Sequence, residues 1–240
     1  MIIFSASNAL TKWLKIELPR LPSLDGKRIG TQPLVTDSEI ISWQCHVVQN
    51  NYRHGGYTVI AVEAYSRFTI LIPFDLAPTQ MELQEQLCER WAMMLVSLMV
   101  KHGEIGRDQI PVIFSKFRQK VVNIQWWRNT DLSVNGHVSD AEQWVKQTVN
   151  DRRIDALSED EAFDLAMYIN QFFKRAKDSQ GKKQRFYPVP RFVEDGLHRF
   201  ACDLFDEGSS VSLYSANKHA VTEEGNVVSL ADYRTKHMKQ

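Results

Sequence analysis

The sequence predicts an α+β fold, in which a central mixed or antiparallel sheet is covered by a long helix and followed by a helical C-terminal portion. Two apolar runs, residues 57–63 and 68–74, are rich in Val and Ile, which suit a pleated and buried surface. The polar break between them predicts a β-hairpin, and residues 40–48 precede it as a third strand. In residues 79–102, apolar side chains recur every three or four positions, which indicates a helix lying across the sheet.

The remaining elements follow from shorter signals. We expect a strand over residues 1–4, then a helix over 8–18 with Ser5 or Ser7 as its N-cap. Gly55-Gly56 is expected to form the turn before the hairpin. Two further β-prone runs cover residues 109–114 and 121–127.

Two capping boxes indicate helices in the second half of the chain. Ser139 with Glu142 predicts a helix to about residue 152, and Ser158 with Glu161 predicts one over 159–177. A polar bridge over 178–185 and a last helix over 192–205 follow. The predicted organisation is therefore an α+β domain (1–155), a helical extension packed on it (156–207) and a flexible tail (208–240).

The composition indicates a cellular compartment but does not indicate a class of partner. The 240 residues hold 29 Lys and Arg against 29 Asp and Glu, so net charge favours no class of ligand. Cys45, Cys88 and Cys202 are far apart in the sequence and form no C-x-x-C pair, which is typical of a reducing compartment. No window reaches the roughly 18 apolar residues of a spanning helix, so we expect a cytoplasmic protein with no membrane contact.

Three stretches resemble a bacterial family known only as a domain of unknown function. They are Met1-Ile2-Ile3-Phe4, then Ser42-Trp43-Gln44-Cys45-His46 leading into Val62-Glu63-Ala64-Tyr65-Ser66-Arg67-Phe68, and Ser133-Val134-Asn135-Gly136-His137-Val138-Ser139-Asp140. The resemblance covers residues 1–155. Members of the family tend to carry Asn or Asp at the position of Glu63 and Asn at that of Ser139. The resemblance implies an α+β fold and no particular reaction.

One sequence motif suggests an enzymatic function. Residues 62–67 resemble the strand and turn of retroviral-type integrases, which use converging carboxylates to bind Mg²⁺. Here Gln44 and His46 stand where a first Asp is expected. A metal-dependent phosphodiesterase or integrase-like nuclease that uses Glu63 is therefore the alternative function.

The other chemical motifs are missing or have a structural explanation. The chain has no G-x-S-x-G or phosphate-binding glycine loop, and no two histidines are spaced for a helical zinc site. We predict no catalytic residue, metal or cofactor, so an enzyme is less expected than a binding protein. Gly136-His137 is expected in a loop at a helix start, where backbone N–H groups either bind an anion or only cap the helix.

Two basic clusters with interleaved aromatic residues predict nucleic-acid contact, because cations neutralise phosphates and rings stack on bases. The first comprises Lys174, Arg175, Lys177, Lys182, Lys183 and Arg185; the second comprises Lys116, Arg118, Lys120 and Arg128. A solvated linker and a lysine-protected sheet edge are the alternative explanations.

The tail contributes a third candidate surface. Val227, Leu230, Tyr233 and Arg234 combine apolar and polar side chains after a long spacer, which is typical of a segment that docks on a partner or on its own domain. The leading hypothesis is a non-catalytic intracellular binding or adaptor protein that contacts protein or nucleic acid. An oligomer with exposed Trp126 and Trp127 at its interface is a further possibility.

Overall fold

The computed structural model describes residues 1–23, 29–50, 56–177 and 181–204. Residues Met1–Ala201 form one compact unit. Beyond it, the structure describes the short 3₁₀ turn η2 (Cys202–Leu204). Residues 156–201, expected as a helical extension, belong to the same compact unit. The tail residues Val227, Leu230, Tyr233 and Arg234 lie outside the described residues.

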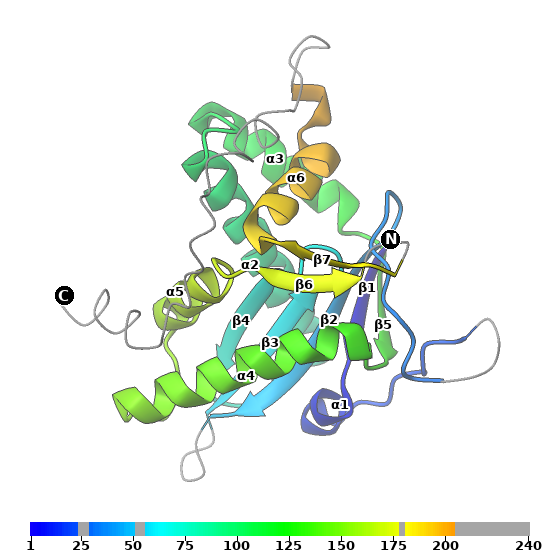
Figure 1. The fold of residues 1–240 in the computed structure, drawn as a ribbon, viewed down its shortest axis with the longest axis vertical. Coiled ribbons are helices and arrows are strands. Elements are labelled where there is room, and N and C mark those ends of the chain that lie inside the picture. Colours follow the sequence, from blue (N-terminus) through cyan, green and yellow to red (C-terminus); the bar gives the residue numbers. More distant parts are fainter. Residues whose placement is uncertain (24–28, 51–55, 178–180, 205–240) are drawn as a thin grey trace. The chain divides into compact units, whose positions relative to one another are not determined.

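A five-stranded mixed sheet forms the centre of the unit and confirms the predicted α+β class (Figure 1). Its order is β4-β3-β2-β1-β5, built from β1 (Ile2–Ala6), β2 (Ile41–Gln49), β3 (Tyr57–Glu63), β4 (Thr69–Phe74) and β5 (Ile124–Arg128). β2, β3 and β4 form an antiparallel meander, whereas β1 is parallel to both β2 and β5. The predicted hairpin and the strand before it are therefore confirmed.

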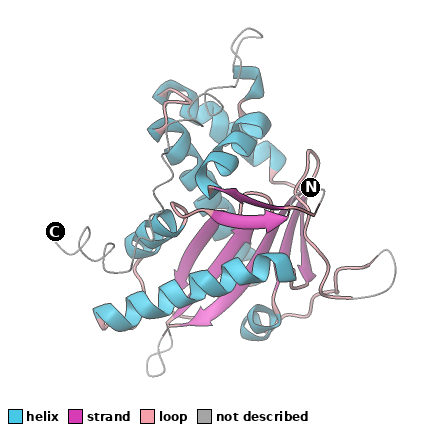
Figure 2. Cartoon of the chain, viewed as in Figure 1, coloured by secondary structure: helices cyan, strands magenta, loops and turns pink. Residues whose placement is uncertain are grey.

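Helices cover both faces of this sheet (Figure 2). Successive strand residues point to opposite faces. Trp43 of β2 contacts Trp91 of α2 (Gln80–Lys101), with ring centroids 5.3 Å apart. His46, on the other face of β2, lies 3.8 Å from Glu142 of α4 (Leu132–Arg152). The long helix α2 thus covers the sheet as predicted, and α4 covers the opposite face.

The last helix, α6 (Pro188–Phe200), contributes to the same core as α2. Phe192 stacks on Phe68 beside β4 with ring centroids 3.8 Å apart, and Phe200 contacts Phe117 at 5.1 Å. Fully burying a side chain of this size contributes about 1.5–3 kcal/mol, so α6 is an integral part of the fold. None of the helices that the structure describes is long and apolar enough to cross a membrane.

Residues 109–114 were predicted as a strand, and this is wrong. They belong to the 3₁₀ turn η1 (Arg107–Gln109) and to α3 (Ile110–Lys120). Pro111 lies in the first turn of α3, where its missing N–H has no helical partner to lose. Ile113 and Phe117 are the buried residues of α3 and lie one turn apart, so a helix buries both on one face.

The prediction for α4 placed its start too late. Asp131, not Ser139, is the N-cap, and its side chain accepts a hydrogen bond from the N–H of Ser133. Gly136 and His137 therefore lie within the helix rather than in a loop before it. A glycine in a helix interior costs only about 0.5–1 kcal/mol relative to alanine, which tertiary packing readily offsets.

Residues 159–185 also differ from the prediction. Helix α5 (Glu159–Ile169) begins at the predicted capping box but stops before residue 177. The rest forms a second, antiparallel sheet of β6 (Lys174–Lys177) and β7 (Lys183–Phe186), part of which was expected to be helix and part a polar bridge. Helix α6 starts at Pro188, earlier than expected. The first helix, α1 (Asn8–Leu14), is capped by Ser7 and ends early, because Lys15 adopts a left-handed conformation.

Candidate nucleic-acid interface

The first basic cluster folds into the β6–β7 hairpin, which crosses above α4 in the view of Figure 1. Its register places Arg175 opposite Arg185 and Lys177 opposite Lys183. The side chains of Arg175, Lys182, Lys183 and Arg185 are exposed. Lys174 is the exception, because it is only 8% exposed and burial lowers its pKa.

The hairpin also carries the aromatic side chains of the cluster. The guanidinium carbons of Arg175 and Arg185 lie 5.7 and 4.9 Å from the ring centroid of Phe173. On the inner side of the hairpin, the guanidinium of Arg191 lies over the ring of Phe186 at 3.5 Å. The ring of Phe173 remains 42% exposed. The hairpin therefore presents cations and a ring together, although the exposed ring beside the cations is Phe173 and Phe186 is buried.

The second basic cluster is spread over two elements. Lys116, Arg118 and Lys120 lie on α3, and Arg128 ends β5. The Lys120 ammonium lies 6.0 Å from the ring centroid of Phe200. Trp126 is only 7% exposed, contacts Phe4 and donates a hydrogen bond to Gln84. It is therefore unavailable for base stacking, and the hypothesis of an exposed Trp126 at an oligomer interface is wrong.

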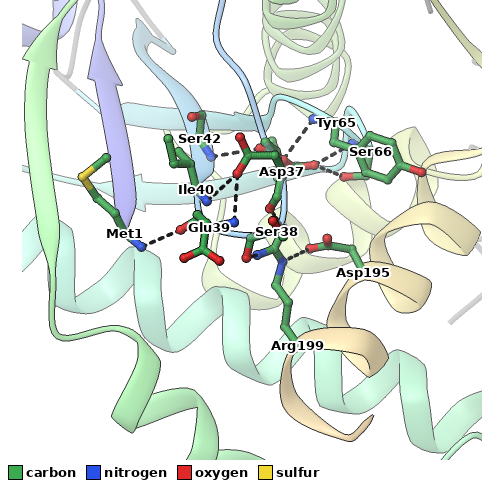
Figure 3. Close-up of polar contacts among 12 residues, drawn as sticks. Met1, Asp37, Ser38, Glu39, Ile40, Ser42, Tyr65, Ser66, Asp195 and Arg199 are labelled. Carbon is green, nitrogen blue, oxygen red and sulfur yellow. Dashed lines mark hydrogen bonds and ion pairs between the residues drawn. The ribbon is translucent and has the colours of Figure 1, made fainter. Parts of the chain in front are cut away.

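Glu63 has a structural role that its sequence context did not reveal. It is 3% exposed, and its carboxylate accepts hydrogen bonds from the Thr36 hydroxyl, the backbone N–H groups of Tyr65 and Ser66, and the Ser66 hydroxyl. Figure 3 shows the donors of the turn beside the loop that precedes β2. Both carboxylate oxygens are thus used to hold the β3–β4 turn.

Arg67 lies in the same turn, but its guanidinium is not hydrogen-bonded to Glu63. Its Nη2 donates to the Oγ of Ser133 at the start of α4, 3.2 Å away. Arg191 of α6, not Arg67, covers the ring of Tyr65 at 5.0 Å. Arg67 is 6% exposed, although its charge gave no sequence signal for burial.

His46 belongs to a separate polar group. Its Nδ1 lies 2.8 Å from the Ser7 hydroxyl, and its Nε2 lies 3.8 Å from Glu142. Burial lowers the pKa of His46, while the charge of Glu142 opposes this shift. The Ser7 hydroxyl also accepts from the N–H of Leu10, so it serves as the cap of α1.

The described residues contain no further cluster that suggests a metal or a thiol nucleophile. Among them, no group of three or more His, Cys, Asp or Glu side chains is arranged to hold a metal ion. Burial raises the pKa of Cys45, and it raises that of Cys88 to about 12. Both thiols are therefore protonated at neutral pH, which disfavours nucleophilic chemistry.

Comparisons of the chain with protein-family models, curated proteins and solved structures gave no match. The resemblance of residues 1–155 to a bacterial family stays a prediction. Function must therefore be argued from the geometry of the side chains.

Proposed function

We propose that this chain is a non-catalytic binding protein that contacts nucleic acid through the outer face of the β6–β7 hairpin. The observation that supports the proposal is the register, in which the exposed Arg175 faces the exposed Arg185. Like charges directly opposite each other destabilise an antiparallel pair. Phosphates bound along the hairpin would relieve this repulsion, which gives the arrangement a use.

The neighbouring aromatic residues suit a single-stranded ligand. Phe173 precedes β6 and Tyr187 follows β7, and their side chains are 42% and 45% exposed. Stacking of a base on an aromatic ring contributes about 1–3 kcal/mol and tolerates any base. The hairpin combines such rings with cations, so we expect single-stranded RNA or DNA to bind with little sequence preference.

A salt series with the full chain tests the proposal. Fluorescence anisotropy should show binding of labelled single strands, with log affinity falling against log salt by about 0.7 for each phosphate contact. The double variant K183Q/R185Q should bind roughly tenfold more weakly and lower this slope, because it removes cations that face phosphates. The matched control K101Q/R107Q removes equal charge at exposed positions on α2 and η1 and should bind normally.

The same variants distinguish nucleic-acid binding from a second role of the basic side chains, in which they only protect the strand edges from pairing with other chains. If the basic side chains only prevent strands from pairing with other chains, the hairpin variant will aggregate while its affinity stays unchanged. Absence of binding by the wild-type chain at low salt would overturn the proposal. Co-purification with and without nuclease then distinguishes a nucleic-acid partner from a protein partner, since only the former is lost on digestion.

A further inference from the structure

Among the described residues of the compact unit, two arginines are deeply buried, and their hydrogen bonding differs sharply. Arg199 is 7% exposed and uses all its nitrogens: Nε donates to Asp195, Nη1 to the backbone oxygen of Ser38 and Nη2 to that of Asp37 (Figure 3). Arg67 is 6% exposed, but its Nε and Nη1 have no partner among the residues that the structure describes. Leaving a buried donor unpaired costs about 1–3 kcal/mol, so Arg67 requires an explanation.

The turn that carries Arg67 holds it in a costly conformation. Its φ is +57°, in the left-handed region that disfavours residues with a Cβ. The Glu63 carboxylate and the Ser66 hydroxyl, which accepts from the N–H of Phe68, keep the turn in this shape. The fold therefore positions the guanidinium against α4 at the expense of backbone strain.

Other groups of matching chemistry converge on this guanidinium. Ser133, its one partner, is exposed, and His137 follows one turn later on α4, where side chains share a face. The Nδ1 of His137 also lacks a partner within the described part of the chain, and the backbone of Arg175 acts on its ring, raising the pKa against the larger effect of burial. Lys174 is close enough that its charge, with that of Arg67, lowers the pKa of His137.

The carboxylates near Arg67 do not accept hydrogen bonds from its guanidinium. Burial lowers the pKa of Arg67, while the charges of Asp131 and Glu63 oppose this shift. Yet Asp131 accepts from the N–H groups of Ser133 and Leu34, and Glu63 accepts from its own turn and from Thr36. The guanidinium therefore keeps two buried nitrogens, Nε and Nη1, that have no hydrogen-bond acceptor among the described residues.

We propose that Arg67 and Ser133, supported by the charge of Lys174, bind a single phosphate group beside His137, at the junction of the β3–β4 turn, α4 and β6. Arginine is well suited to phosphate, because its planar guanidinium donates several hydrogen bonds to one group. The cluster reaches the surface at Ser133, which is exposed and accepts from the Arg67 guanidinium.

The burial of Arg67 favours a terminal phosphate. A phosphodiester is flanked by sugars on two sides, whereas a terminal phosphate offers three oxygens that a recessed guanidinium can reach. Because β6 carries Lys174 and begins the basic hairpin, the phosphate at the end of a bound strand is the expected ligand. This inference rests on the proposed function and names the group recognised at one end of the nucleic acid.

Two sets of binding experiments with the full chain test the site, one with inorganic phosphate and one with oligonucleotides. Inorganic phosphate, compared with chloride at equal ionic strength, should raise the thermal midpoint of unfolding. Oligonucleotides with a 5′- or 3′-phosphate should bind roughly tenfold more tightly than the same strand with hydroxyl ends, as one charge-assisted arginine–phosphate contact predicts. A preference for phosphorylated ends assigns the site to nucleic acid, and an effect of inorganic phosphate alone assigns it to a small phosphorylated molecule.

Variants identify the residues involved. S133A and R67K should each abolish most of the preference for phosphate, because each changes a donor in the cluster. R199K alters the other buried arginine and should keep the preference even if it lowers stability. The inference is overturned if the wild-type chain shows neither effect of phosphate, or if R199K loses the preference as R67K does.

The binding experiments distinguish a failure of the phosphate site from a failure of the proposed function. If strands bind through the hairpin in a salt-dependent way but their ends do not matter, only the phosphate site is refuted. If no strand binds at low salt, the proposed function is refuted instead.

Discussion

The side-chain amide of Asn170 hydrogen-bonds to both backbone groups of Thr69. The N–H of Thr69 donates to Oδ1, and Nδ2 donates to the Thr69 oxygen, each over 2.8 Å. Both residues are fully buried, and β4 is an edge strand of the main sheet. Asn170 therefore takes the place of a neighbouring strand at this edge and attaches the end of α5 to the sheet.

Replacing Asn170 with Ala should lower the free energy of unfolding by about 2–4 kcal/mol, because it leaves the buried N–H and C=O of Thr69 unpaired. Denaturant unfolding followed by circular dichroism measures this loss. Asn150→Ala, at an exposed position near the end of α4, is the matched control and should change stability by less than about 0.5 kcal/mol. Equal effects of the two substitutions would show that the Asn170 bridge contributes little.

Two helical glycines should respond oppositely to the same substitution. A Cβ at Gly196 of α6 would lie 2.4 Å from a methyl carbon of Leu95 on α2, so Gly196→Ala should cost about 1–3 kcal/mol through overpacking. At Gly136 of α4 an added Cβ meets nothing within 4 Å, so Gly136→Ala should stabilise by about 0.5–1 kcal/mol. Thermal unfolding of both variants checks the pair, and destabilisation at Gly136 would contradict it.

Glu63→Gln should destabilise the β3–β4 turn by about 2–4 kcal/mol, because an amide nitrogen replaces an oxygen that accepts from buried donors. The midpoint of urea unfolding measures this effect. The alternative of a metal-dependent nuclease predicts a different result, in which E63Q remains stable and phosphodiester hydrolysis by the wild-type chain in Mg²⁺ is lost. That outcome would reject the structural role of Glu63.

His137 should make stability depend on pH. Burial, with the charges of Lys174 and Arg67, lowers its pKa from 6.5 to about 4. Between these values the unfolded chain binds a proton that the folded chain does not, so stability falls as pH drops from about 6.5 towards 4, by up to about 3 kcal/mol. Urea unfolding across this range should show a smaller loss for H137N, and an equal loss would refute the assignment.

The main sheet was predictable because its signals are local. The β-branched runs in residues 57–63 and 68–74 form β3 and β4, and Ser158 caps α5 as its capping box with Glu161 indicates. The basic character of residues 174–185 is likewise visible in the sequence, although its arrangement in two paired strands is not. Strand periodicity and capping depend on neighbours within a few positions, so one sequence suffices to find them.

The segments whose secondary structure was predicted wrongly are determined by contacts with residues far away in the sequence. Residues 109–114 have β-branched side chains, but helix α3 forms because it buries Ile113 and Phe117. Helix α5 ends where Asn170 bonds to Thr69, a residue 101 positions earlier in the chain. Intrinsic preferences differ by less than about 1 kcal/mol for most residues, so such contacts override them.

The sequence by itself determined the central hairpin, the N-cap of α5 and where basic residues gather. Only the tertiary structure decided which charged groups are buried and what they meet. It placed Arg67 beside Ser133 and His137 and gave Arg199 a complete set of acceptors. The physical reason is that burial and pairing of a charge depend on segments far apart in the chain, which come together only when the sheet and its helices pack.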